Sequence, residues 1–238
     1  MSAVTPLLRA IKDGNTFEQT VERLATAVRM GVVATGERLP PERELAEQLN
    51  VSRVTLRDAI KALNQAGYVV STRGRTGGTV VVYDPTMRPA SDPRRVARAL
   101  GAAEVLDALA YRSIVEPGAA ELAASRQLDA ADVARLRAAA RVVKSADGPS
   151  RRVEDSRFHI LIAELSGSPS VAAAVAEVQA RLDELLAAIP VFHKNIAHSD
   201  RQHARVAQAI LRSDPAAARA AMSEHVDGTA SLLRGLLT

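Results

Sequence analysis

The chain has 238 residues, with 31 Lys and Arg against 27 Asp and Glu, and it contains no cysteine. The absence of cysteine excludes a disulfide framework and thiolate metal sites, and it fits the reducing cytoplasm in which we expect the protein. No apolar run approaches the roughly 18 residues of a membrane-spanning helix, and no signal-peptide pattern opens the chain, so we expect no membrane partner. A chain of this length can hold two modest domains.

The first predicted elements are a helix, a helix-turn-helix and a hairpin. Thr16 is expected to cap the first helix, with Gln19 at the reciprocal position of a capping box. The hairpin follows the helix-turn-helix: residues 68–70 and 79–83 have the composition of strands, and residues 71–78 form the tip between them. This order of elements predicts a winged helix-turn-helix.

The helix-turn-helix itself has clear start and stop signals. Pro41 suits the first position of a helix, where its missing N–H costs nothing. After a short break, Ser52 is a good N-cap for the second helix, which Gly67 ends. Apolar residues repeat along that second helix at spacings of three and four, which indicates a buried stripe. They are Leu56, Ala59, Ile60 and Leu63.

The opposite face of the second helix is basic. It carries Arg53, Thr55, Arg57 and Lys61, and residues 51–75 hold five basic side chains against one acidic one. Such an excess favours phosphate binding, and Arg or Thr near a helix N-terminus can reach base edges in the major groove. A solvated structural face is the alternative. The pattern favours a double-stranded DNA operator as partner.

Residues 16–82 resemble the DNA-binding domain of GntR-type bacterial transcription regulators. Two ungapped cores carry the resemblance, GERLPPERELA at residues 36–46 and VSRVTLR at residues 51–57. The resemblance implies DNA contacts from an arginine of the first core and both arginines of the second, and a wing tip that enters the minor groove. The DNA-binding residues that we expect are Arg43, Ser52, Arg53, Thr55, Arg57, Arg73 and Gly74.

A domain boundary is predicted where prolines accumulate. Residues 84–93 contain three prolines in ten positions, which excludes regular structure, so we place a linker at residues 84–92. The winged helix-turn-helix domain then covers residues 1–83, with an N-terminal arm at residues 1–15. The second domain covers residues 93–238.

The second domain has a helical pattern throughout. Alanine is abundant, strand-like alternation is absent, and the connections are short, which predicts an all-α antiparallel bundle and a mainly α fold class for the chain. The helices are expected at residues 93–100, 103–125, 130–145, 150–165, 169–189, 191–213 and 215–236.

A second chemical pattern lies in this bundle. Asp155 and His159 are spaced i, i+4 on one helix, and His203 and His225 lie beside apolar residues on two others. If these side chains converge, three imidazoles and a carboxylate suit a divalent transition metal such as Zn, Ni or Mn, and not calcium. The spacing alone leaves the alternative open that each histidine is an ordinary hydrogen-bonded residue.

Residues 96–237 are similar to the FCD ligand-binding domain of the FadR-like branch of GntR regulators. The resemblance rests on RSIVE at 112–116, DSRFH at 155–159, HARVAQAI at 203–210 and MSEH at 222–225. Metal-binding members use an Asp and three His at these places. The implied metal ligands are Asp155, His159, His203 and His225.

The same resemblance implies an effector site. The family often places an arginine of the first motif on the acid group of its ligand, which here is Arg112. An ion pair between Arg112 and Glu116 along one helix is the alternative for that side chain. The glutamate common before the third metal ligand is replaced by Gln202, which changes the surroundings of the ligands but not the ligand set.

These observations predict a ligand-responsive transcription regulator, a repressor, that binds a near-palindromic operator as a homodimer and responds to a small organic acid. A pure metal sensor is one alternative. A metal-dependent hydrolase is another, but such an enzyme needs a general base beside the ion, and Glu154 lies about 100° from the Asp155–His159 face. We therefore expect no enzymatic activity.

Overall fold

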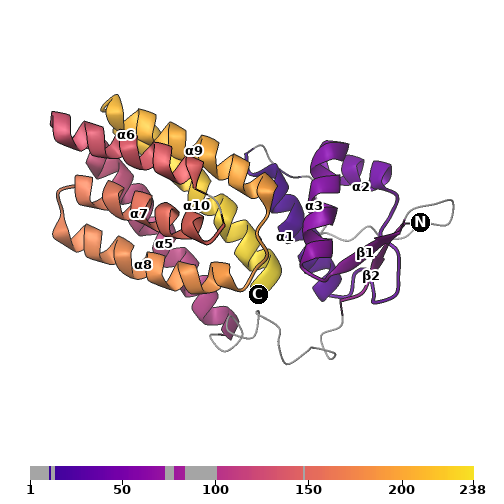
Figure 1. The fold of residues 1–238 in the computed structure, drawn as a ribbon. Coiled ribbons are helices and arrows are strands. Elements are labelled where there is room, and N and C mark those ends of the chain that lie inside the picture. The colour runs from indigo at the N-terminus through magenta and orange to yellow at the C-terminus, as the bar shows by residue number, and fades with distance from the viewer. Residues whose placement is uncertain (1–10, 12–13, 73–77, 84–100, 147) are drawn as a thin grey trace. The chain divides into compact units, whose positions relative to one another are not determined.

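The computed structural model describes residues 11, 14–72, 78–83, 101–146 and 148–238 (Figure 1). Most of the predicted N-terminal arm, the linker at 84–92 and the helix at 93–100 lie outside the described residues. The contacts divide the chain into two compact units. Unit 1 comprises residues 1–102, 187–195 and 228–238, and unit 2 comprises residues 103–186 and 196–227.

Unit 1 contains the predicted winged helix-turn-helix. Its helices are α1 (Thr16–Arg29), α2 (Glu42–Leu49) and α3 (Arg53–Gln65), and its strands are β1 (Val69–Thr72) and β2 (Gly78–Val81). The strands pair antiparallel, as a hairpin requires, and an isolated bridge joins the segment before α2 to β2. The core lies between the helices, where the predicted apolar stripe of α3 is buried. The largest buried aliphatic side chains here are Leu24, Leu45, Leu49, Leu56 and Leu63.

The helix ends follow most of the sequence signals. Ser52 caps α3: the Thr55 N–H donates to Ser52 Oγ over 3.0 Å. Gly67 follows the end of α3 with φ +74°, a left-handed conformation that favours glycine. Pro41 is one position earlier than predicted: its extended backbone, with ψ 137°, makes it the N-cap, and α2 begins at Glu42.

The predicted capping box of α1 is wrong. Asn15 is the N-cap residue and α1 begins at Thr16, so the Thr16 side chain is not at the capping position. The Asn15 side chain makes no cap hydrogen bond to the helix. Instead it lies against α10, close to Gly228, where a Cβ atom would come within 2.9 Å of its amide. Packing within unit 1 therefore determines this side chain's position.

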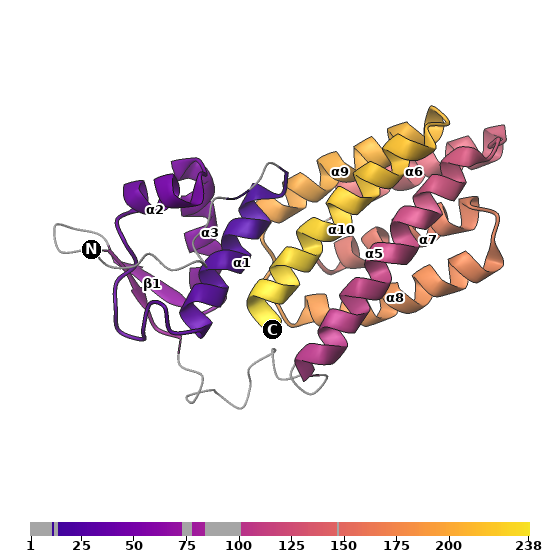
Figure 2. The same ribbon diagram turned by 180° about the vertical axis from the view of Figure 1, so that it is seen from behind.

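The described helices of the second predicted domain all begin and end within two residues of their predicted bounds. In Figures 1 and 2 they lie side by side with their axes roughly aligned, as a bundle requires. The mainly α fold class is confirmed. The bounds are α5 (Gly101–Ser125), α6 (Ala130–Ser145), α7 (Gly148–Leu165), α8 (Pro169–Ala187), α9 (His193–Leu211) and α10 (Pro215–Leu237).

The core of unit 2 is built from aliphatic and alanine side chains, with Phe158 as its one aromatic residue among the described positions. Alanine permits close approach of helices, so a bundle with so few large side chains still packs. The Phe158 ring lies 4.8 Å from the His203 ring, centroid to centroid. The core of unit 2 therefore extends to the ring of His203. Among the described residues, no helix has the length and apolar character to cross a membrane.

Candidate metal centre and DNA-binding surface

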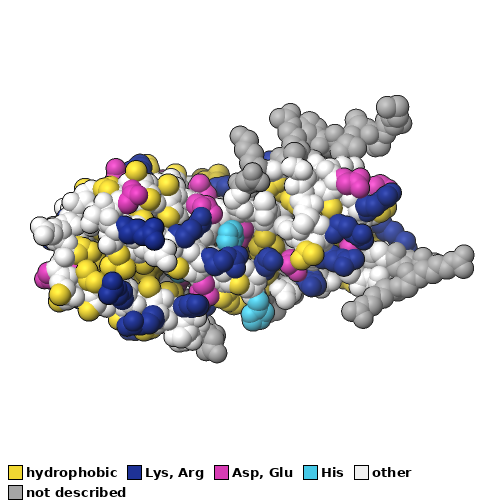
Figure 3. Space-filling model, turned by 90° about the horizontal axis from the view of Figure 1, so that it is seen from above, with side chains coloured by type: hydrophobic (Ala, Val, Ile, Leu, Met, Phe, Trp, Pro, Cys, Tyr) yellow, Lys and Arg dark blue, Asp and Glu magenta, His cyan; other side chains and the backbone are white. Residues whose placement is uncertain are grey.

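The basic face of α3 is exposed on unit 1. Arg53, Arg57 and Lys61 are exposed, while Thr55 is half-buried and its hydroxyl lies 2.8 Å from Ser52 Oγ. Arg57 Nε donates to Glu42 Oε2 over 2.7 Å, but its side chain stays 55% exposed and accessible to a ligand. Figure 3 shows Lys and Arg side chains gathered on the visible surface of this unit.

A groove marks the turn between α2 and α3. It has a volume of about 510 Å³ and is lined by Arg43, Glu47, Asn50, Ser52 and Arg53, among others. Asn50 adopts a left-handed conformation with φ 54°, which gives the tight turn that brings the two helices together. Of the predicted contacts, Arg43, Ser52 and Arg53 line this groove, and Thr55 and Arg57 follow along α3. Arg73 and Gly74 lie outside the described residues.

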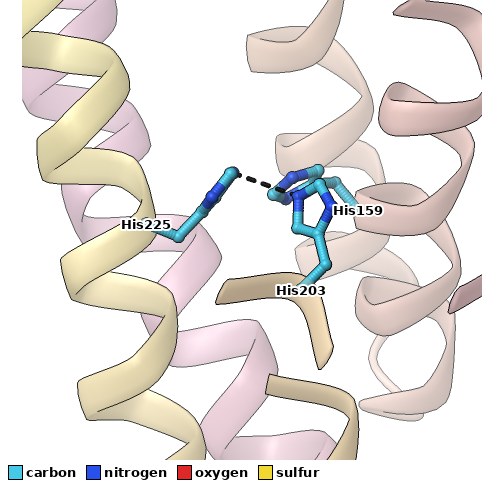
Figure 4. Close-up of side chains that lie close together, drawn as sticks. All are labelled: His159, His203 and His225. Carbon is cyan, nitrogen blue, oxygen red and sulfur yellow. Dashed lines mark hydrogen bonds between the residues drawn. The ribbon is translucent and has the colours of Figure 1, made fainter. Parts of the chain in front are cut away.

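Three histidines converge inside unit 2. His159 on α7, His203 on α9 and His225 on α10 are 1%, 1% and 3% exposed. One ring nitrogen from each lies within 4.8 Å of the other two (Figure 4). His203 Nε2 and His225 Nε2 are 3.3 Å apart. The structure therefore brings together three imidazoles that the sequence places on separate helices.

Asp155 lies at the edge of this histidine cluster, one helical turn before His159. Its Oδ1 is 3.5 Å from His203 Nε2 and its Oδ2 is 3.9 Å from His159 Nε2. The Asp155 side chain is 22% exposed, so it faces both the cluster and the solvent side. All four residues that the sequence predicts as ligands are neighbours.

A second layer of polar side chains surrounds the cluster. Glu116 Oε2 lies 2.8 Å from His159 Nδ1. The carboxylate and the imidazole are in close contact, but the two atoms lack the alignment of a hydrogen bond. Glu116 Oε1 accepts from Arg112 Nε over 2.9 Å and from Gln179 Nε2 over 2.6 Å. Gln202 Oε1 is 3.3 Å from His225 Nδ1, so Gln202 does border the ligands.

Two of these neighbours were not predicted from the sequence. Glu116 was predicted only as a partner of Arg112, and Gln179 was not predicted in any role. The i, i+4 spacing of Arg112 and Glu116 was a visible signal for their ion pair. The approach of Gln179 from α8 left no signal, because it depends on how separate helices pack.

Burial controls the charge of the cluster. Loss of hydration lowers the pKa of His203 to about 4, and the charge of Asp155 opposes this only in part. Burial likewise lowers the pKa of His225, helped by the neighbouring His203. Burial raises the pKa of Glu116, but the charge of Arg112 and the contact with His159 outweigh it and hold that pKa well below its usual range. His203 and His225 are therefore neutral near pH 7, the state in which imidazole binds metals.

The donor set fits a transition-metal ion. Ligand atoms about 2.0–2.1 Å from one ion are about 3.0 Å apart at adjacent octahedral positions and about 3.4 Å apart in a tetrahedron. The 3.3 Å and 3.5 Å separations at His203 Nε2 agree with these values, whereas the 3.9 Å separation at His159 and the 4.8 Å span of the three histidine nitrogens are longer. In addition, both ring nitrogens of His159 are buried without a hydrogen-bond partner, and a buried imidazole with an unused nitrogen suits the role of a metal ligand.

Arg112 is buried beside this centre. Its side chain is 2% exposed and it forms the ion pair with Glu116 that the sequence offered as one alternative. Its Nη1 has no hydrogen-bond partner. A buried guanidinium N–H without an acceptor is costly, so this atom remains available to a ligand oxygen.

Comparison with known proteins identifies the family. Residues 16–81 match the model of bacterial regulatory proteins of the gntR family, and residues 107–228 match the FCD domain. The chain is similar to RmpR of Mycobacterium gastri, named as an HTH-type transcriptional regulator, with 32% identity over 95% of this chain and 84% of the relative.

Other relatives agree. The Exu regulon transcriptional regulator of Escherichia coli (strain K12) is 29% identical over 91% of this chain and 84% of its own length. The solved structure of E. coli McbR/YncC covers 92% of this chain and 96% of its own, with 17% identity and a TM-score of 0.51, and it shares the fold.

These relatives are transcription regulators and not enzymes, which agrees with the expectation from the sequence. The matched ranges account for both the basic helix-turn-helix and the helices that carry the histidine cluster. The chain belongs to the GntR family of DNA-binding transcription regulators, in the FadR-like branch that combines a winged helix-turn-helix with an FCD domain.

Proposed function

We propose that the protein is a ligand-responsive repressor whose FCD domain binds a divalent transition-metal ion and a small carboxylate effector. The observation that carries the proposal is the convergence of His159, His203 and His225 beside Asp155, inside the domain that follows the DNA-binding motif. These four side chains would hold the ion, with Zn, Ni and Mn as the best candidates. The ion supplies positive charge and open coordination positions to which an acid can bind.

Arg112 is the proposed second anchor for the acid. Its partnerless Nη1 offers a donor, and its guanidinium is close enough to lower the pKa values of His203 and His225 by charge. A carboxylate between an ion and an arginine is stabilised from both sides. Because Glu116 already neutralises much of Arg112, the ion contributes most of the attraction for an anionic effector.

The proposed DNA complex contains two copies of the chain. A recognition helix reads one half-site, so a homodimer matches a near-palindromic operator by its own two-fold symmetry. In this proposal the domain boundaries are residues 1–83 and 93–238, joined by the linker at 84–92. The family matches at 16–81 and 107–228 support them, although residues 187–195 and 228–238 cluster with unit 1.

An effector can change operator affinity only if it binds the two arrangements of the protein unequally. We test this with fluorescence anisotropy on DNA selected from a random library by the purified protein. If the protein is an acid-responsive repressor, a small carboxylate should weaken its binding to this DNA when Zn²⁺ is present. The carboxylate should have no effect after chelation. A change caused by chelation alone, with no acid dependence, identifies a metal sensor instead.

The ligand set has its own test. His203→Ala should remove the bound metal from purified protein, measured by elemental analysis. His198→Ala is the matched control, because His198 is on the same helix, is half-buried and is not part of the histidine cluster. Retention of metal by the His203 variant, or equal loss in both variants, would contradict the proposed ligands.

A further inference from the structure

Glu116 is the only buried carboxylate of unit 2 among the described residues, and its oxygens face two hydrogen-bond donors and one histidine ring nitrogen. It is 1% exposed, and its two oxygens contact side chains from three other positions in the bundle. Oε1 faces Arg112 and Gln179, and Oε2 faces His159. A buried carboxylate is stable only when it is paired and hydrogen-bonded, and these contacts supply that pairing.

The contact with His159 determines which ring nitrogen carries the proton. With a carboxylate oxygen 2.8 Å from Nδ1, a lone pair on Nδ1 would repel it, so the proton belongs on Nδ1. The lone pair of His159 is then on Nε2, the ring nitrogen that lies 3.9 Å from Asp155 Oδ2. Glu116 thereby directs the metal-binding lone pair of His159 into the cluster.

The other two histidines receive weaker support. His225 Nδ1 faces the neutral amide oxygen of Gln202 at 3.3 Å, and His203 Nδ1 has no hydrogen-bond partner. A carboxylate raises the basicity of a ligating imidazole more than an amide does. The three ligands therefore differ in how firmly they are oriented.

Resting on the proposed function, we propose that Glu116 is a positioning residue of the metal centre: it fixes the tautomer of His159 and makes that histidine the best-oriented ligand. Gln179 and Arg112 hold the Glu116 carboxylate in place from the other side. The same carboxylate thus joins the metal ligand His159 to Arg112, the proposed anchor for the acid.

The test uses the full chain and Zn²⁺ alone. Glu116→Gln should raise the dissociation constant for Zn²⁺ about 10- to 100-fold, measured by competition with a chelator. Since this variant leaves the buried Arg112 without its counter-charge and can fail to fold, the double variant Arg112→Met, Glu116→Gln is measured alongside. In the double variant an amide replaces the carboxylate and no buried charge is left over.

Ser166→Ala is the matched control. Ser166 is a buried polar residue of the loop that follows α7, and its hydroxyl bonds only backbone groups, donating to the Ala163 carbonyl over 2.6 Å. The Ser166→Ala variant should lose some stability and keep its Zn²⁺ affinity. An unchanged Zn²⁺ affinity in the double variant would overturn the role of Glu116 while leaving the metal site intact.

A second measurement needs no metal. The protein is treated with chelator and studied by ¹⁵N NMR at about pH 8, where histidine side chains are generally neutral. In the wild-type protein the proton of His159 should be on Nδ1. In the double variant it should exchange between Nδ1 and Nε2. A proton on Nε2 in the wild-type protein would overturn the inference. Wild-type protein that binds no Zn²⁺ but carries the Nδ1 proton would instead overturn the proposed metal function, so the two failures are distinguishable.

Discussion

The two candidate sites of this protein are opposites in their physical chemistry. The basic face of α3 is exposed, and its residues follow one another within a single helix and its cap. The histidine cluster is buried, and its members come from α7, α9 and α10. Exposed charges act through the solvent and are screened by salt, whereas buried polar groups depend on every neighbour that replaces their lost water.

This difference predicts which properties of the protein a substitution at each site will change. A change on the basic face should alter DNA affinity and its salt dependence with little effect on folding. A change at the cluster should alter both folding and metal binding, because the same side chains are packed into the core.

The largest effect is expected from Arg53→Ala with Arg57→Ala. Each arginine suits a guanine contact worth about 2 kcal/mol, so the pair should cost operator affinity about 10³-fold, measured by fluorescence anisotropy. Because both side chains are exposed, circular dichroism should show unchanged helical content. The loss of the exposed Arg57–Glu42 pair should itself cost little stability.

Arg135→Ala with Arg219→Ala provides the control. These arginines are 53% and 52% exposed on unit 2 and also pair with glutamates, so the control removes the same charge from a comparable environment. If the control weakens operator binding as much as the substitutions on α3, the effect is one of net charge and α3 is not the recognition helix.

The second-largest effect is a loss of stability, expected from a substitution in the core of unit 2. Phe158→Ala should destabilise the protein by about 3–5 kcal/mol, because it leaves a cavity in the core of unit 2. Urea unfolding measures this, with Val153→Ala as control, since Val153 lies on the same helix and is 48% exposed. The variant should also bind Zn²⁺ more weakly, because the Phe158 ring packs against His203. A loss of stability with unchanged Zn²⁺ affinity would show that core and cluster are independent.

The pH dependence of the metal-free protein should report on the same region. Unfolded histidines take up a proton near pH 6.5, while burial lowers the pKa of folded His203 to about 4 and lowers that of His225 as well. Below about pH 6.5 the unfolded state therefore binds more protons, so stability should be greatest above that pH and fall towards pH 4. Urea unfolding across this range, with chelator present, should give a shallower slope for His203→Gln. An equal slope would place the titrating groups elsewhere.

The contrast between the sites also explains what the sequence could predict. The Ser52 cap, the apolar stripe of α3 and the bounds of α6 depend on neighbours within a few residues, and all three are confirmed. The cap of α1 depends on a contact between Asn15 and Gly228, far along the chain, and its prediction was wrong.

The candidate metal centre was predictable only in part, for the same reason. Asp155 and His159 share a helix, so their spacing suggested a common face. The contacts of Glu116 with His159 and Gln179 come from the packing of separate helices, and no periodicity encodes them. Tertiary packing, and not local propensity, decides the surroundings of a buried ligand.

The smallest predicted effect compares two helix caps. Ser52 caps α3 and Asp129 caps α6, each by accepting from the backbone N–H three residues on. Replacing either residue by alanine should cost about 1 kcal/mol of stability, measured by thermal unfolding. Only Ser52→Ala should also reduce operator affinity, since frayed first-turn residues of α3 include Arg53 and Thr55. Equal operator affinity in the two variants would mean that DNA itself orders the start of α3. The Ser52 cap would then not be needed to position the arginines of α3 for DNA binding.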